Sequence, residues 1–260
     1  MNCPRVAITG LGLWTTGFPT AAAWALGVAD PTVVKPLGMA LDKVNRRRAG
    51  PLARALADAT AAAMVMAQVD ATAVPTVVGS ALGEAITMTG LLDAMWRHNL
   101  PMSPAEFTVS VHNAASGLIS IANKNRGMTT SLAADEDTPG AALLEAIGLV
   151  MTRGAPAVVA CADEPAPEAL VQHAPPWAML AAAVVLAPYV PGQPCLGTLR
   201  ILAGEAPTLA PRECGELLRN NPQVGLLWLL DAVQRGCRGR LRLDVGTGRG
   251  FCAELEPGGA

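Results

Sequence analysis

The chain has 260 residues, of which 51% are hydrophobic and only 15% are charged. This composition excludes a disordered chain, because burial of so many apolar groups offsets the entropy lost when the backbone is ordered. With 19 basic and 21 acidic residues the net charge is −2, which argues against the strongly basic face that nucleic-acid binding requires. The length suits one large domain or two small ones.

Neither a membrane-spanning segment nor a metal centre is expected. The longest apolar run, at 177–188, is shorter than the roughly 20 residues that a spanning helix needs. The first residues lack the charged region and long apolar stretch of a signal peptide, which predicts a cytoplasmic protein. The six cysteines form no CxxC pair, so we expect reduced thiols, no metal site and no cofactor.

Hydrophobic periodicity predicts alternating strands and helices along the first 161 residues. An apolar run at 5–13 indicates a buried strand, closed by a turn at glycines 10, 12 and 17. The elements that follow are helix 48–67, strand 74–81, helix 84–96, helix 114–122, strand 129–133, helix 138–151 and strand 157–161. Strands that alternate with helices favour an α/β fold with parallel βαβ units and a sheet covered on both faces.

The pattern changes after residue 161. Two consecutive strands are predicted at 178–187 and 196–202, as a hairpin-like addition to the sheet. A helix at 224–234 and strands at 241–245 and 251–255 follow, and glycines within 246–250 indicate a hairpin turn between the two strands. Because we find no repeat and no long linker, we expect a domain at 1–190 and a short extension at 191–260 that packs on it.

Polar residues stand at the starts of two predicted helices. Ser110 and Asn113 are possible caps of helix 114–122, and Asp135, Asp137 and Thr138 are possible caps of helix 138–151. His112 lies between Val111 and Asn113. Its residue type is compatible with a partly buried histidine that makes one hydrogen bond, and also with a role in proton transfer.

One stretch carries the most specific signal. It contains Val111-His112-Asn113-Ala114-Ala115-Ser116-Gly117 and, after a predicted strand, Ala133-Ala134-Asp135-Glu136-Asp137-Thr138. This stretch resembles the N-terminal half of the β-ketoacyl synthases of the thiolase-like superfamily, in which a strand delivers a nucleophilic cysteine to the start of the next helix. Segments 5–12, 79–84 and 181–188 resemble the same family in the right order. The resemblance implies a layered α-β-α fold, the first half of a ketosynthase with a shortened second half.

The sequence departs from this family at two points. No cysteine lies between Cys3 and Cys161, and the resemblance places Glu136, or Asp135, at the nucleophile position. A carboxylate at a helix start is stabilised by the helix dipole, but it is a poor acyl acceptor compared with a thiolate. No histidine follows His173, so the histidines that the family uses for decarboxylation are missing. We therefore expect no catalytic residue and no condensation by this chain alone.

A ketosynthase-like chain without its cysteine resembles the chain-length factors that pair with an active ketosynthase in type II polyketide systems. Its sequence motifs at 111–117 and 133–138 and its short length resemble the truncated partner subunits of aryl polyene and xanthomonadin-type pathways. The resemblance implies a heterodimer with a catalytic ketosynthase, and only indirect contact with an acyl carrier protein. Strand 129–133, with Thr129, Thr130 and Ser131, would be the pairing edge. The residues expected to wall the partner's acyl tunnel are Met88, Phe107, Val109, Val111, His112 and Asn113.

Two other functions remain open at this point. The chain could decarboxylate malonyl-carrier protein, in which case the reaction would rely on Glu136 or His112. It could also be a homodimeric scaffold that binds an acidic acyl carrier protein through Arg46, Arg47 and Arg48. The plain alternative for these arginines is a solvated helix.

Overall fold

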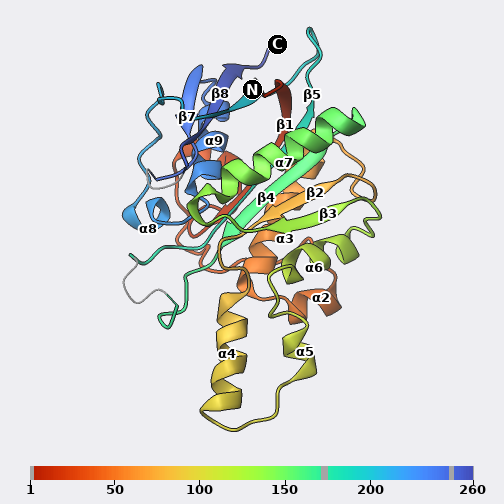
Figure 1. The fold of residues 1–260 in the computed structure, drawn as a ribbon, viewed down its shortest axis with the longest axis vertical. Coiled ribbons are helices and arrows are strands. Elements are labelled where there is room, and N and C mark those ends of the chain that lie inside the picture. Colours follow the sequence, from red (N-terminus) through yellow and green to blue (C-terminus); the bar gives the residue numbers. More distant parts are fainter. Residues whose placement is uncertain (1–2, 171–174, 246–248, 260) are drawn as a thin grey trace.

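The computed structural model describes residues 3–170, 175–245 and 249–259. One sheet of eight strands, in the order β3-β2-β4-β5-β1-β6-β8-β7, runs through the molecule (Figure 1). The strands are β1 (Val6–Thr15), β2 (Thr76–Gly79), β3 (Thr129–Leu132), β4 (Ala157–Asp163), β5 (Leu180–Pro188), β6 (Gly197–Ala203), β7 (Gly239–Arg242) and β8 (Phe251–Pro257).

Helices cover both faces of this sheet. They are α1 (Ala21–Leu26), α2 (Lys43–Arg48), α3 (Pro51–Ala67), α4 (Ala85–Trp96), α5 (Pro104–Phe107), α6 (Ala114–Ala122), α7 (Thr138–Arg153), α8 (Glu216–Arg219) and α9 (Val224–Gln234), with a 3₁₀ turn η1 (Asp135–Asp137) before α7. Alternate residues of β5 belong to different cores: Ala181 and Ala183 pack with α3 and α6, whereas Ala182 and Val184 pack with α7 and α9. The layered α-β-α arrangement that we expected is confirmed.

The sheet is parallel on one side only. β2 pairs in parallel with β3 and with β4, as the alternating pattern predicted, and all the other neighbours are antiparallel. The predicted hairpin of β5 and β6 is wrong, because β1 lies between them. Val6 of β1 pairs with Pro188 on one side and with Leu199 on the other. An apolar run reveals a buried strand, but it does not reveal which distant strands it joins.

The predicted turn at Gly10 and Gly12 is also wrong, since both glycines lie inside β1. A Cβ atom at Gly10 would stand 2.1 Å from the carbonyl oxygen of Ala63, and one at Gly12 would stand 1.8 Å from that of Ala59. The two glycines therefore let the backbone of α3 approach the strand closely. Gly17, with φ of 83°, forms the turn.

Several local predictions need correction. The helix predicted at 48–67 begins only at Pro51, as α3, because proline favours the first position of a helix. Ser110 donates to the carbonyl of Phe107 instead of capping α6, and Asn113 makes no side-chain capping bond. The short helices α1, α2, α5 and α8 were not predicted, since four to six residues show no clear period. His173 and most of the predicted turn at 246–250 lie outside the described residues.

The C-terminal segment shares the sheet and the core of the rest of the chain. Asp231 of α9 accepts a hydrogen bond from the indole Nε1 of Trp24 at 3.2 Å and pairs with Arg212 and Arg235. β6 joins this segment to β1, and β8 and β7 extend the sheet beyond β6. A boundary at residue 190 remains a prediction.

Candidate functional site

β3 forms one edge of the sheet. The carbonyl of Met128, just before β3, accepts a hydrogen bond from the amide of Thr76 in β2. The carbonyl of Leu132 accepts one from the amide of Ser80, just after β2. Because backbone groups alternate in direction along a strand, those of Thr129 and Ser131 face outward, where no strand of the described chain pairs with them. An unpaired edge of this kind is a template for a strand from another chain.

Helix α6 fixes the side chains of β3 on one face. The hydroxyls of Thr129 and Ser120 lie 3.0 Å apart, and Ser131 donates to Ser116 at 2.8 Å. Ser116 in turn donates to the carbonyl of Asn113 at 2.9 Å. Ser131 of the predicted edge is therefore linked by hydrogen bonds to residues 107–113, which hold most of the predicted wall residues and which we call the wall segment.

Helices α4 and α5, with their connecting loop, project from the body of the molecule (Figure 1). We call residues 85–107 the arm. Only Ala85 and Leu91 of α4 are buried, and large apolar side chains of the arm are exposed: Ile86, Leu92, Trp96, Leu100, Met102 and Phe107. Trp96 is 76% exposed. Apolar surface concentrated in this way indicates contact with another protein.

The predicted wall residues divide into two groups. Phe107, Val111 and Asn113 are exposed, so they are available to a partner. Met88 and Val109 are half-buried, and Val109 packs against the core beneath α3 and α6. The wall segment overlaps the end of the arm at Phe107.

His112 is held in place by the turn after β2. Its Nε2 lies 2.9 Å from the carbonyl oxygen of Ser80. Gly83, with φ of 62°, packs against it so closely that a Cβ there would stand 2.9 Å from the Cα of His112. This environment matches one of the two alternatives from the sequence, a partly buried histidine with one hydrogen bond. The contacts of His112 with Ser80 and Gly83 fix the wall segment to the body of the molecule.

The start of α7 carries carboxylates and no thiol. Asp135 adopts the left-handed region with φ of 52°, and Thr138 Oγ1 accepts from the amide of Ala134 and donates to the carbonyl of Asp135. Asp137 accepts from the backbone amide of Arg249 at 2.8 Å. Thr138 thus bridges the two ends of the turn before α7 and does not cap the helix, and Asp137 makes no side-chain capping bond but contacts the segment before β8. The predicted caps at Asp137 and Thr138 are wrong.

Glu136 is half-buried, and its Oε2 finds no hydrogen-bond donor among the described residues. Partial burial, and then the carboxylates of Asp135, Asp244 and Asp137, raise the pKa of Glu136. The thiol of Cys161 packs on Gly79, as does Thr138, but it is fully buried, and this burial raises its pKa. A buried neutral thiol is not a nucleophile.

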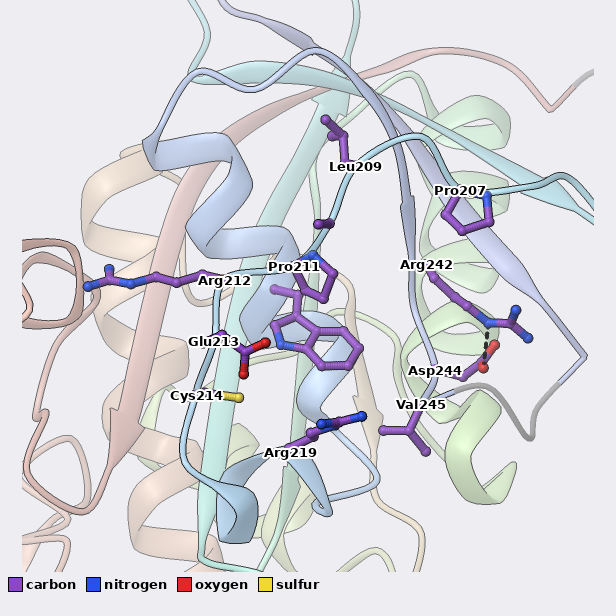
Figure 2. A pocket seen from close by; sticks show the side chains of 12 residues that line it. Pro207, Leu209, Pro211, Arg212, Glu213, Cys214, Arg219, Arg242, Asp244 and Val245 are labelled. Carbon is purple, nitrogen blue, oxygen red and sulfur yellow. Dashed lines mark hydrogen bonds and ion pairs between the residues drawn. The ribbon is translucent and has the colours of Figure 1, made fainter.

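A pocket of about 320 Å³ lies beside this region, where Asp244 forms part of the wall (Figure 2). Arg242 reaches across to Asp244, with Nε 2.8 Å from Oδ1. Arg212, at another wall, pairs with the buried Asp231 at 3.3 Å. Two of the pocket's arginines are therefore neutralised by carboxylates of the chain itself.

Sequence reasoning missed the buried carboxylates around the turn after β2. Asp163, at the end of β4, accepts hydrogen bonds from four donors: Ser80 Oγ, Gln223 Nε2 and the amides of Ala81 and Leu82. Burial raises the pKa of Asp163 even though all four donors lower it. A carboxylate that ends an apolar strand is the signal that could have revealed this link between the turn and the segment before α9.

Glu84 and Glu164 form a second buried group. Both residues are almost inaccessible, and Oε2 of Glu84 and both carboxylate oxygens of Glu164 have no hydrogen-bond partner among the described residues. Burial, and then the neighbouring charge of Glu164, raise the pKa of Glu84 to about 8. Burial raises the pKa of Glu164 to about 7. The pair therefore holds at least part of a proton at neutral pH.

Among the described residues, none of the helices combines the length and the apolar character that a membrane span requires. The same residues contain no group of three or more histidine, cysteine, aspartate or glutamate side chains that could hold a metal ion.

Solved structures share this architecture at low sequence identity. The ketosynthase ApeO in complex with its chain length factor ApeC from Xenorhabdus doucetiae matches with a TM-score of 0.73 and 17% identity, over 97% of this chain and 99% of that chain. The ishigamide ketosynthase/chain length factor matches with a TM-score of 0.63 and 16% identity, over 77% and 68%. A type II ketosynthase in complex with its acyl-carrier protein, AntDE:AntF, matches with a TM-score of 0.61 and 14% identity, over 78% and 70%.

These likenesses identify the fold as that of the thiolase-like ketosynthases. No curated protein matches the sequence. The family profile described as the β-ketoacyl synthase N-terminal domain matches residues 22–214, about three quarters of the chain. The chain therefore belongs to the β-ketoacyl synthase N-terminal domain family.

Proposed function

We propose that this chain is a non-catalytic, chain-length-factor-like subunit that pairs with an active ketosynthase and shapes its acyl tunnel. The observation that carries the proposal is the start of α7. There the resemblance expects a nucleophilic cysteine, and this chain has Asp135, Glu136 and Asp137. A half-buried carboxyl group with a raised pKa cannot replace a thiolate in acyl transfer.

The open edge of β3 supports the proposed pairing. Thr129 and Ser131 would pair with an antiparallel strand of the ketosynthase, so that one sheet continues through both subunits. The arm would then bury its exposed apolar side chains against the same partner, which gives an interface larger and more apolar than strand pairing alone. A chain of similar length in the ApeO–ApeC complex, which it matches almost end to end, is consistent with this role.

The volume of the side chains in the wall segment would limit how far the growing acyl chain extends in the partner's tunnel. Phe107 and Val111 are exposed next to the arm and could enter the partner's tunnel, while His112 and Asn113 anchor the segment to the turn and to β3. By the sequence resemblance, the product would be a polyene of the aryl polyene type. The acyl carrier protein would dock mainly on the catalytic subunit.

Co-expression with a ketosynthase encoded nearby tests this proposal. We expect the two proteins to elute together from size-exclusion chromatography, and condensation of malonyl-carrier protein to require both. Condensation by the ketosynthase alone, with the same product and rate, would contradict the proposal. Malonyl decarboxylation by this chain alone, lost in Glu136→Gln, would favour the enzyme alternative instead.

A further inference from the structure

Two neighbouring pockets lie between α3 and the loop at 28–41, away from the edge of β3. They share Trp14 and Lys35 in their walls. The larger pocket has a volume of about 600 Å³ and the smaller about 460 Å³, which is the size range of small-molecule sites. Apolar side chains dominate both linings, among them Leu37 and Met39 in the larger pocket and Val34 and Met179 in the smaller.

The smaller pocket is lined by cationic side chains. Lys35 and Arg54 line it, and none of the described residues in its wall carries a carboxylate. Neither cation forms an ion pair within the described part of the protein. Arg54 donates from Nη2 to the carbonyl of Arg46 at 2.8 Å, but its buried Nε has no acceptor there. The guanidinium of Arg54 therefore has hydrogen-bonding capacity that the described residues do not use.

Hydrogen bonds and packing between the loop at 28–41 and α3 hold the walls of the two pockets in place. Asp58, the carboxylate that lines the larger pocket, accepts from the amides of Gly38 and Ala40 at 2.8 and 2.9 Å. Gly38 has φ of 67°, and a Cβ there would stand 2.7 Å from Cγ of Arg54. The loop is thus fixed against α3 by Asp58, and the stem of Arg54 packs on it. Both oxygens of Asp58 are used by the loop amides, and Asp58 forms no ion pair with Lys35 or Arg54 in the described part of the chain.

We propose that these pockets form a binding site for an amphiphilic carboxylate. The carboxylate would lie between Lys35 and Arg54, and the hydrocarbon chain would extend past Trp14 into the larger pocket. A guanidinium and an ammonium group complement an anion, and the apolar walls complement a hydrocarbon chain. The pocket in Figure 2 differs, because Asp231 and Asp244 already neutralise Arg212 and Arg242 there.

Calorimetric titration of the full chain with sodium octanoate tests this site without any partner protein. We expect saturable binding at one site and weaker binding of 1-octanol, which has the same chain length without the charge. The double variant Lys35→Gln with Arg54→Gln should bind octanoate roughly tenfold more weakly, since charge-assisted hydrogen bonds are lost. The matched control is Lys43→Gln with Arg47→Gln, which removes the same charge from exposed positions outside the pockets and should bind like the unaltered chain.

A second variant tests the hydrocarbon part. Ala62 lines the larger pocket and is exposed, so Ala62→Phe should fill the pocket without disturbing the core and should weaken octanoate binding. Absence of saturable binding, equal affinity for 1-octanol, or unchanged affinity in both the Lys35/Arg54 and the Ala62 variants would overturn the proposal. These results are independent of whether the chain pairs with a ketosynthase.

Discussion

Phe251 of β8 packs its ring against Gly140 in the first turn of α7. A Cβ at Gly140 would lie 2.7 Å from three carbon atoms of Phe251. The C-terminal strand thus covers the start of the helix at which the sequence resemblance predicts the nucleophile position of a ketosynthase. This contact joins the C-terminal segment to the candidate site.

We expect Gly140→Ala to destabilise the protein by roughly 1–3 kcal/mol, because overpacking forces the ring to move. Urea unfolding measures the change. The control is Gly148→Ala in the same helix, where a Cβ meets nothing within 4 Å and the better helix propensity should stabilise by about 0.5–1 kcal/mol. Combining Gly140→Ala with Phe251→Ala should reduce the cost of the added methyl group, and full additivity would contradict the contact.

Ser131→Pro should weaken assembly with the ketosynthase, because proline removes the outward-facing amide of β3 without removing a bond to β2. Co-purification of the two chains measures the effect. Ser131→Ala is the matched control: it loses the hydroxyl bond to Ser116 but keeps the amide, so the complex should form. Equal assembly of the proline and alanine variants would exclude pairing at this edge.

Side-chain volume in the wall segment should control product length. Val111→Trp should shorten the polyene made by the complex, and Phe107→Ala should lengthen it, because these side chains are 39% and 51% exposed and thus available to the partner. Mass spectrometry of the products measures both changes, and size-exclusion chromatography shows that the complex persists. Val65→Trp, on the exposed face of α3, should leave the product unchanged. Identical products from all three variants would count against a tunnel role.

Stability should fall as the pH rises from about 4.5 to about 8. The folded pKa values of Glu84 and Glu164 are about 8 and about 7, above the ordinary value of 4.5, so the folded state holds more protons in this window. Their favourable contribution is complete below pH 4.5 and is lost as the pH rises through the folded values.

Urea midpoints at several pH values measure this dependence. Glu84→Gln should flatten it, because glutamine keeps the shape and cannot lose a proton. Glu145→Gln, at an exposed position of α7, should leave the slope as it is. An unaltered slope in Glu84→Gln would show that other groups cause it.

Sequence patterns determined which segments form the main elements. Long apolar runs and helical periods located β1, β4, α7 and α9, because burial of one face or of both faces leaves a local record in the residue order. The motif around Asn113 also indicated the family, and the carboxylates at 135–137 predicted a position for the candidate site. Both inferences need only neighbouring residues.

Tertiary structure decided what lies next to what. The position of β1 between β5 and β6, the close approach of α3 at Gly10 and Gly12, and the meeting of Glu84 with Glu164 all join residues far apart in the chain. The positive pocket at Lys35 and Arg54 arises in the same way. A residue's polarity records whether it is buried, but not its partners, because partners are selected by packing among elements that no local pattern describes.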